Sequence, residues 1–240
     1  MKLLITQPTF LPWIGYFDLI SDADVVVFLD DVQFEKRSWQ QRNSIVTKNG
    51  LEWISIPIKV KGKRNQLIKD AYINNNEINF EKIKKKINQN YIKSKYFSTY
   101  QEEFFNIFYS GLKNGSLASL NLSLIFWILK VLKINKKICL TSELNSKNKS
   151  TQKIIEICKI LKIDNYLSTA GSESYLKKDI DIIKNNKINI FFHNYMHPKY
   201  VQCFKPFFEY ASIIDLLFNE GDDSYKILKS GRFKYTKLLV

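Results

Sequence analysis

The sequence is poor in the residues that build disulfide scaffolds and zinc sites. Its 240 residues contain three cysteines and two histidines, and no two cysteines form a CxxC pair. Cys139, Cys158 and Cys203 are odd in number and widely spaced, which is typical of a protein in a reducing compartment. We therefore expect neither a disulfide framework nor a zinc site.

Long apolar segments are also missing. The apolar start, residues 1–6, is interrupted by Gln7 and Pro8 and lacks the extended apolar stretch of a signal peptide. The most apolar helical stretch, residues 120–132, is too short for a bilayer and contains Asn121 and Ser123. These features predict a cytoplasmic protein without a membrane span.

Arginine is scarce although the chain is strongly basic. The formal charge is +14, yet only four of the 37 basic residues are arginines, and the lysines are spread over the whole chain. Surfaces that read nucleic acids are usually clustered and rich in arginine, and no DNA-binding or RNA-binding motif is present. We expect no DNA partner, although the diffuse positive field would attract a tRNA or an anionic sugar nucleotide.

The sequence does contain alternating apolar runs and helical segments. Strands are predicted at residues 2–6, 25–29, 137–140, 165–167 and 188–192. Asn49 and Gly50, between the β-rich runs 44–47 and 51–57, predict a β-hairpin. Helices are predicted at residues 13–20, 151–161 and 180–185. Three further helices are expected to form an inserted cap over about residues 79–132. The expected architecture is a single α/β domain over residues 1–240, with a Rossmann-like, mainly parallel sheet.

Polar residues follow the predicted strands, where ligands bind on parallel sheets. Gln7 follows the first strand, and Asp30 and Asp31 follow the second. The two carboxylates could bind a cation or accept hydrogen bonds from a ligand's hydroxyl or amine. Equally, they could cap a helix and form an ion pair with a nearby basic side chain.

Residues 38–43 combine planar hydrogen-bonding groups with an aromatic ring. Trp39, Arg42 and Asn43 would suit a sugar, a base or a phosphate. Because arginine is so scarce in this chain, Arg42 indicates a bidentate contact with an anion. The alternative is a structural salt bridge to one of the strand-end aspartates.

Both histidines, His193 and His197, follow the last of these strands. His197 precedes Pro198, which favours an extended or turn conformation. It is the first candidate for a general base, because imidazole titrates near neutral pH, and Asp30 or Asp31 is the alternative. A structural role for His197 is the competing interpretation.

Several strings in the sequence resemble the WbqC-like family. They are residues 7–17, 27–34, 38–43, 166–168, 171, 175–176, 197–202 and 212–221, so that the resemblance covers residues 1 to about 225. The substrate-binding residues that we predict within these strings are Gln7, Trp13, Tyr16, Gln33, Trp39, Arg42, Asn43, Ser168, Gly171, Tyr175, Tyr200 and Gln202.

The resemblance also implies a function. The family is found beside genes for bacterial surface polysaccharides, including O-antigen, and is associated with the tailoring of amino sugars. It implies an enzyme that transfers an N-acyl group, such as an aminoacyl or glycyl group, to an amino-sugar nucleotide. The donor is left open among a free amino acid with ATP, an aminoacyl-tRNA and a thioester, and no cofactor is identified. The alternatives are a non-catalytic module that binds a sugar nucleotide or polyanion, and an isomerase or hydrolase acting on the same sugar.

Overall fold

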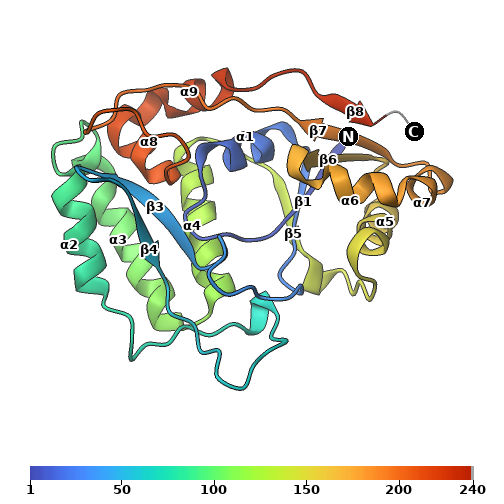
Figure 1. The fold of residues 1–240 in the computed structure, drawn as a ribbon, viewed down its shortest axis with the longest axis horizontal. Helices are drawn as coiled ribbons and strands as arrows, with labels where there is room; N and C mark the ends of the chain where they lie inside the picture. Colours follow the sequence, from blue (N-terminus) through green and yellow to red (C-terminus); the bar gives the residue numbers. More distant parts are fainter. Residues whose placement is uncertain (239–240) are drawn as a thin grey trace.

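The computed structural model describes residues 1–238 and is built around one twisted sheet (Figure 1). The strands of this sheet follow the order β5-β2-β1-β6-β7-β8, and all neighbours are parallel except β7 and β8. Their bounds are Lys2–Thr6 for β1, Val25–Phe28 for β2, Lys137–Leu140 for β5, Asn165–Thr169 for β6, Asn189–His193 for β7 and Thr236–Leu238 for β8. The predicted Rossmann-like, mainly parallel sheet is confirmed.

The predicted hairpin is a separate two-stranded sheet. Strand β3, Arg42–Thr47, pairs antiparallel with β4, Gly50–Ser55. Gly50 adopts a φ of +102°, a conformation that suits glycine, and the Thr47 hydroxyl donates to its carbonyl at 2.9 Å. Pairing begins two residues before the predicted run because Arg42 and Asn43 also face Ser55 and Ile54.

Nine α-helices surround the sheet and the hairpin in the part of the chain that the structure describes. Their bounds are Ile14–Asp22 (α1), Phe80–Tyr91 (α2), Phe97–Asn114 (α3), Leu117–Val131 (α4), Ser150–Leu161 (α5), Glu173–Lys178 (α6), Ile180–Asn185 (α7), Ile213–Glu220 (α8) and Ser224–Ser230 (α9). Helix α2 begins where the Asn79 side chain accepts a hydrogen bond from the Lys82 amide at 2.8 Å. Gly115, at a φ of +80°, ends α3.

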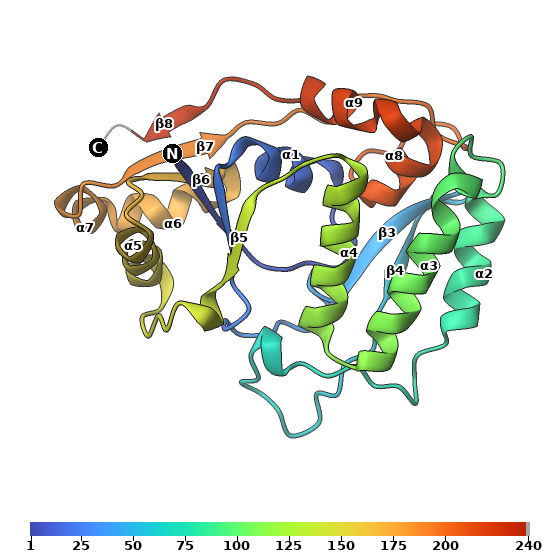
Figure 2. The same ribbon diagram turned by 180° about the vertical axis from the view of Figure 1, so that it is seen from behind.

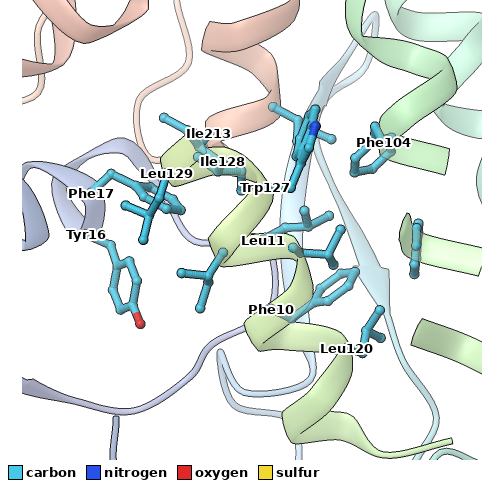
Figure 3. Close-up of a cluster of buried hydrophobic side chains, with 14 of the residues drawn as sticks. Phe10, Leu11, Tyr16, Phe17, Phe104, Leu120, Trp127, Ile128, Leu129 and Ile213 are labelled. Carbon is cyan, nitrogen blue, oxygen red and sulfur yellow. The ribbon is translucent and has the colours of Figure 1, made fainter. Parts of the chain in front are cut away.

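The sheet is buried on both faces, which explains why β1 and β2 are apolar throughout. Leu4 and Val26 pack into a larger core with α1, α3, α4 and α8, whereas Leu3 and Val25 pack into a smaller core with α5, α6 and α7. Figures 1 and 2 show these two helical layers on opposite sides of the sheet. In Figure 3, Phe10 and Leu11 lie close to α4. The helices between β4 and β5 therefore share one core with the sheet.

The chain order creates a change of direction next to β1. From β1 the chain passes to β2 and later to β5 on one side, while β6 and β7 lie on the other side. In sheets of this kind, ligands bind beyond the carboxyl ends of the strands at the point where the order reverses. This point lies between the ends of β1 and β6. Among the described residues, no helix is both long and apolar enough to cross a membrane.

Candidate functional site

Two adjoining cavities lie at the carboxyl ends of β1, β6 and β7. They have volumes of about 610 and 370 Å³ and share Thr6, Trp13 and Tyr16, and we call them together the groove. The other residues that line the larger cavity are Gly15, Leu19, Thr169, Ala170, Gly171, His193, Asn194, Tyr195, Met196 and Phe233. The smaller cavity is completed by Gln7, Thr9, Pro12, Trp39, Asn43 and Tyr210. The groove therefore occupies the position that the strand order favours for a ligand.

The Trp13 ring belongs to the walls of both cavities. It meets Tyr195 edge to face at 5.5 Å between ring centroids, and its centroid is 5.3 Å from that of Tyr210. The ring also covers Gly15, where an added Cβ atom would lie 2.2 Å from it. Glycine at position 15 is therefore required for this placement of Trp13.

Polar groups accompany the aromatic rings of the groove. The Tyr16 hydroxyl donates to the Gln7 carbonyl at 2.9 Å, and burial raises the pKa of Tyr16 above its ordinary value. The Gln7 side chain accepts a hydrogen bond from Gln40 at 2.8 Å, which fixes its orientation. Tyr16 is therefore a neutral hydrogen-bonding group at working pH.

Trp39 and Asn43 contribute differently to the smaller cavity. Trp39 is 53% exposed, and its ring is tilted against Trp53 at 5.3 Å. Asn43 is buried and donates to the Leu11 carbonyl at 2.8 Å, which supports Leu11 at its positive φ of 43°. Trp39 thus offers a free aromatic face, whereas Asn43 also holds the loop after β1 in place.

A buried ionic cluster underlies the larger cavity. His193, at the end of β7, places Nε2 at 2.6 Å from Asp18 Oδ2 on α1. Arg232 reaches both oxygens of the same carboxylate, at 2.8 Å to Oδ1 and 3.0 Å to Oδ2. Sequence reasoning missed this cluster, because Asp18 is separated from His193 by 175 residues and from Arg232 by 214 residues. The available signals were a lone charged residue on the buried side of α1 and a histidine at a strand end.

The family comparison agrees with the motifs that surround this groove. A model of the WbqC-like protein family matches residues 7–227, nearly the whole chain. This chain belongs to the WbqC-like family. It is also 29% identical over 230 residues to the uncharacterized protein Rv1507c of Mycobacterium tuberculosis, and the match covers 95% of this chain and 97% of that protein. No solved structure matches this chain.

In this WbqC-like protein, Asp30 and Asp31 join the ends of β2 and β5. The Asp30 carboxylate accepts hydrogen bonds from the Ser142 amide at 2.9 Å and from the Thr141 hydroxyl at 3.0 Å. Asp31 forms an ion pair with Lys153 at 2.7 Å. Neither aspartate lines the two cavities of the groove. Their hydrogen bonds are those of a structural junction, and a proton-transfer role for them stays a prediction.

Arg42 and His197 do not line the groove. The Arg42 guanidinium stacks on the Trp53 ring at 4.4 Å, and no ion pair joins it to Asp30 or Asp31 within the described residues. His197 is buried, its Nδ1 lies 2.9 Å from the Pro198 carbonyl, and its ring stacks on Trp13 at 6.2 Å. Burial lowers the pKa of His197. His197 therefore contacts the groove residue Trp13, Arg42 contacts Trp53, and neither side chain lines a cavity of the groove.

Tyr200 and Gln202, from the same family motif as His197, surround a buried carboxylate. The Tyr200 hydroxyl and the Gln202 side chain each donate to Asp215 Oδ2 at 2.8 Å. Gln202 also accepts from the Phe208 amide at 2.8 Å and thereby orders the segment that leads to Tyr210. These two predicted substrate-binding residues support the wall of the smaller cavity from behind.

The remaining predicted residues divide between the groove and the surface. Gly171 lines the larger cavity, whereas Ser168 is buried outside the lining, with its hydroxyl 2.5 Å from that of Ser172. Tyr175 is exposed on α6. Gln33 lies in a different surface hollow and bonds weakly to the Arg64 carbonyl at 3.4 Å. The groove therefore gathers six of the predicted substrate-binding residues: Gln7, Trp13, Tyr16, Trp39, Asn43 and Gly171.

A third cavity, of about 1140 Å³, lies between α2 and the tip of the hairpin. Its lysines are Lys48, Lys82, Lys85, Lys86 and Lys93, and we call it the lysine cavity. Glu52 also lines it and pairs with Lys86 at 2.8 Å. Within residues 1–238, no group of three or more histidine, cysteine or acidic side chains is arranged to hold a metal ion.

Proposed function

We propose that this protein transfers an N-acyl group, such as an aminoacyl or glycyl group, to an amino-sugar nucleotide during the synthesis of a bacterial surface polysaccharide such as O-antigen. The observation that carries this proposal is the groove at the sheet edge, where aromatic faces alternate with amide and hydroxyl groups. Sugar rings and bases stack on aromatic side chains, while amides and hydroxyls bind their polar edges. The three free cysteines support a cytoplasmic location for the reaction.

The size of the groove and the charge of the protein support a ligand with two parts. Each cavity falls within the usual volume of a small-molecule site, and Trp13 lies between them. One cavity would hold the nucleotide and the other the amino sugar, with the ring of Trp13 packed against both. The formal charge of +14 would attract the anionic diphosphate to the protein.

The experiment that tests this function uses UDP-linked amino sugars with glycine and ATP, with glycyl-tRNA and with acetyl-coenzyme A. We expect the mass of the sugar nucleotide to increase by one acyl group with one of these donors. Failure of all three donors, despite binding of the sugar nucleotide in calorimetry, would contradict acyl transfer and favour a non-catalytic binding module.

A matched pair of variants locates binding in the groove. Trp39→Ala removes an exposed ring from the smaller cavity and should weaken binding of UDP-glucosamine roughly tenfold, because stacking on an aromatic side chain contributes about 1–3 kcal/mol. Tyr225→Ala removes an exposed ring on α9, which lines neither cavity, and should leave the affinity unchanged. Equal losses in both variants would exclude the groove as the binding site.

A second candidate function is polyanion binding, which the lysine cavity favours. Five lysines, from the hairpin turn, α2 and the segment just after α2, line one hollow, and Glu52 there is already paired with Lys86. The affinity of these lysines for an RNA should fall steeply as the salt concentration rises. The slope of log affinity against log salt concentration should be smaller when Lys82 and Lys93 are changed to glutamine. Retention of the full slope would attribute RNA binding to the diffuse charge of the protein.

A further inference from the structure

We propose that His193 is the general base of the groove and that Asp18 positions it. The inference rests on the proposed acyl transfer and assigns the proton acceptor of that reaction to a residue outside the family strings that indicate His197. The chain has two histidines, and one of them, His193, lines a cavity of the groove.

The contact with Asp18 defines which nitrogen of His193 can accept a proton. The two side chains are almost completely buried, and Nε2 lies 2.6 Å from Asp18 Oδ2. A carboxylate accepts hydrogen bonds, so the proton of neutral His193 is on Nε2. Its Nδ1 then carries the free lone pair, and no hydrogen bond joins Nδ1 to another described residue. An imidazole oriented in this way by a carboxylate has the arrangement of a general base.

The charged groups around His193 pair with one another. On α1, Asp18 and Asp22 face Arg232, which bonds to both, and Lys2 on β1 also pairs with Asp22 at 3.3 Å. Two carboxylates are therefore balanced by two cations in the cluster next to His193. The neighbouring hydroxyls are those of Tyr195, whose ring stacks on His193 at 5.7 Å, and Tyr235, which donates to Asp22.

The second histidine is less suited to this role. The rings of Trp13, Tyr200, Phe207 and Tyr210 enclose His197, and its buried Nε2 has no hydrogen-bond partner within the described residues. A substrate amine in the groove would have to displace Trp13 or Tyr210 to reach it. His193 needs no such movement, because it already faces the larger cavity.

During acyl transfer, His193 accepts one proton from the sugar amine and returns it to the leaving group. The lone pair of the sugar amine attacks the carbonyl carbon of an activated acyl ester or thioester and forms the new N–C bond. The proton released from the nitrogen passes to His193 Nδ1, and Asp18 stabilises the resulting imidazolium. The bond from the acyl carbon to the donor oxygen or sulfur then breaks, and the departing alkoxide or thiolate takes the proton from Nδ1. Neutral His193 is restored.

Diethyl pyrocarbonate tests the assignment without any acyl-transfer assay, because it carbethoxylates unprotonated imidazole and can reach the largely buried His193 through the larger cavity. We expect peptide mass spectrometry to find the modification on His193 at neutral pH, and UDP-glucosamine to slow it. The His193→Gln variant serves as the control for the modified peptide. Modification confined to His197 would overturn the proposal, whatever the protein's reaction proves to be.

Kinetics of His193→Gln and His197→Gln complete the test. The amide nitrogen of glutamine can still donate to Asp18 but supplies no base, so His193→Gln should lower kcat about a hundredfold with little change in KM and remove the acidic limb of the pH profile. In Asp18→Asn, loss of the carboxylate charge should move that limb to lower pH. Full turnover in His193→Gln together with loss in His197→Gln would overturn the proposal. Absence of turnover in the unmodified protein would reject the proposed function and leave the carbethoxylation result as the decisive one for His193.

Discussion

The stability of this protein should decrease as the pH rises through the titration of Asp215. This side chain on α8 is fully buried, and its Oδ2 accepts hydrogen bonds from Tyr200 and Gln202. Burial raises the pKa of Asp215 to about 6, and hydrogen bonds from Tyr200, Tyr91 and Gln202 offset part of the increase. The protonated carboxyl is therefore the form that the folded state favours.

The direction and size of the effect follow from proton linkage. An aspartate in the unfolded chain has a pKa of about 3.9, so between about pH 4 and pH 6 the folded state holds a proton that the unfolded state has lost. The stabilisation is complete below about pH 4 and is lost as the pH rises through 6. Raising the pKa from about 3.9 to about 6 corresponds to about 3 kcal/mol of unfolding free energy.

Asp215→Asn provides the measurement, because the amide has a similar shape and does not titrate. Urea unfolding of both proteins across this pH window gives the difference in unfolding free energy, in which the contributions of other groups, including His197, cancel. We expect this difference to change by about 3 kcal/mol, with the unmodified protein losing stability relative to Asp215→Asn as the pH rises. A difference that stays constant with pH would show that Asp215 is already ionised at low pH, and the reasoning from its burial would be wrong.

Three further substitutions test other parts of the structure. Gly15→Ala places a methyl group against the Trp13 ring and should displace it. Calorimetry should then detect at least tenfold weaker binding of UDP-glucosamine. Unchanged affinity would show that the position of Trp13 is unimportant for binding. Asp30→Ala removes the acceptor of both the Ser142 amide and the Ser142 hydroxyl and should lower the unfolding free energy in urea by about 3 kcal/mol. A stable variant with lost turnover would instead support the catalytic role predicted from the sequence. Arg42→Lys keeps the charge but loses the planar stack on Trp53 and should cost about 0.5–1 kcal/mol of stability. A loss of UDP-glucosamine affinity larger than this would support the predicted anion contact of Arg42.

The sequence predicted the sheet well because local patterns determine its elements. The apolar runs of β1, β2 and β5 were visible directly, and Asn49 and Gly50 marked the hairpin turn. Helices α6, α8 and α9 were not predicted, since they are only six to eight residues long, and packing rather than periodicity stabilises such short helices. Strand β8 is three residues long and forms only because β7 offers it an edge.

The candidate site was less predictable because it depends on contacts between distant residues. Trp13 and Gly171 were found through the family strings, and both line the groove. His193 and Arg232 could not be connected with Asp18, because no local pattern reports a contact between residues so far apart. Asp30 follows a strand, as predicted, but its hydrogen bonds run along the sheet edge to β5. Position at a strand end therefore indicates proximity to a ligand without specifying the direction of the side chain.

The two unequal cores have a consequence for how the groove opens. The wall of the larger cavity formed by Thr169, Ala170 and Gly171 leads into α6 and α7, two six-residue helices packed on the smaller core. The opposite wall, with Trp13 and Tyr16, belongs to the larger core. In native-state hydrogen exchange, we expect the amides of α6 and α7 to exchange through local openings, while those of β1 and α4 exchange only on global unfolding. A ligand that bridges the two walls would slow exchange in α6 and α7 first.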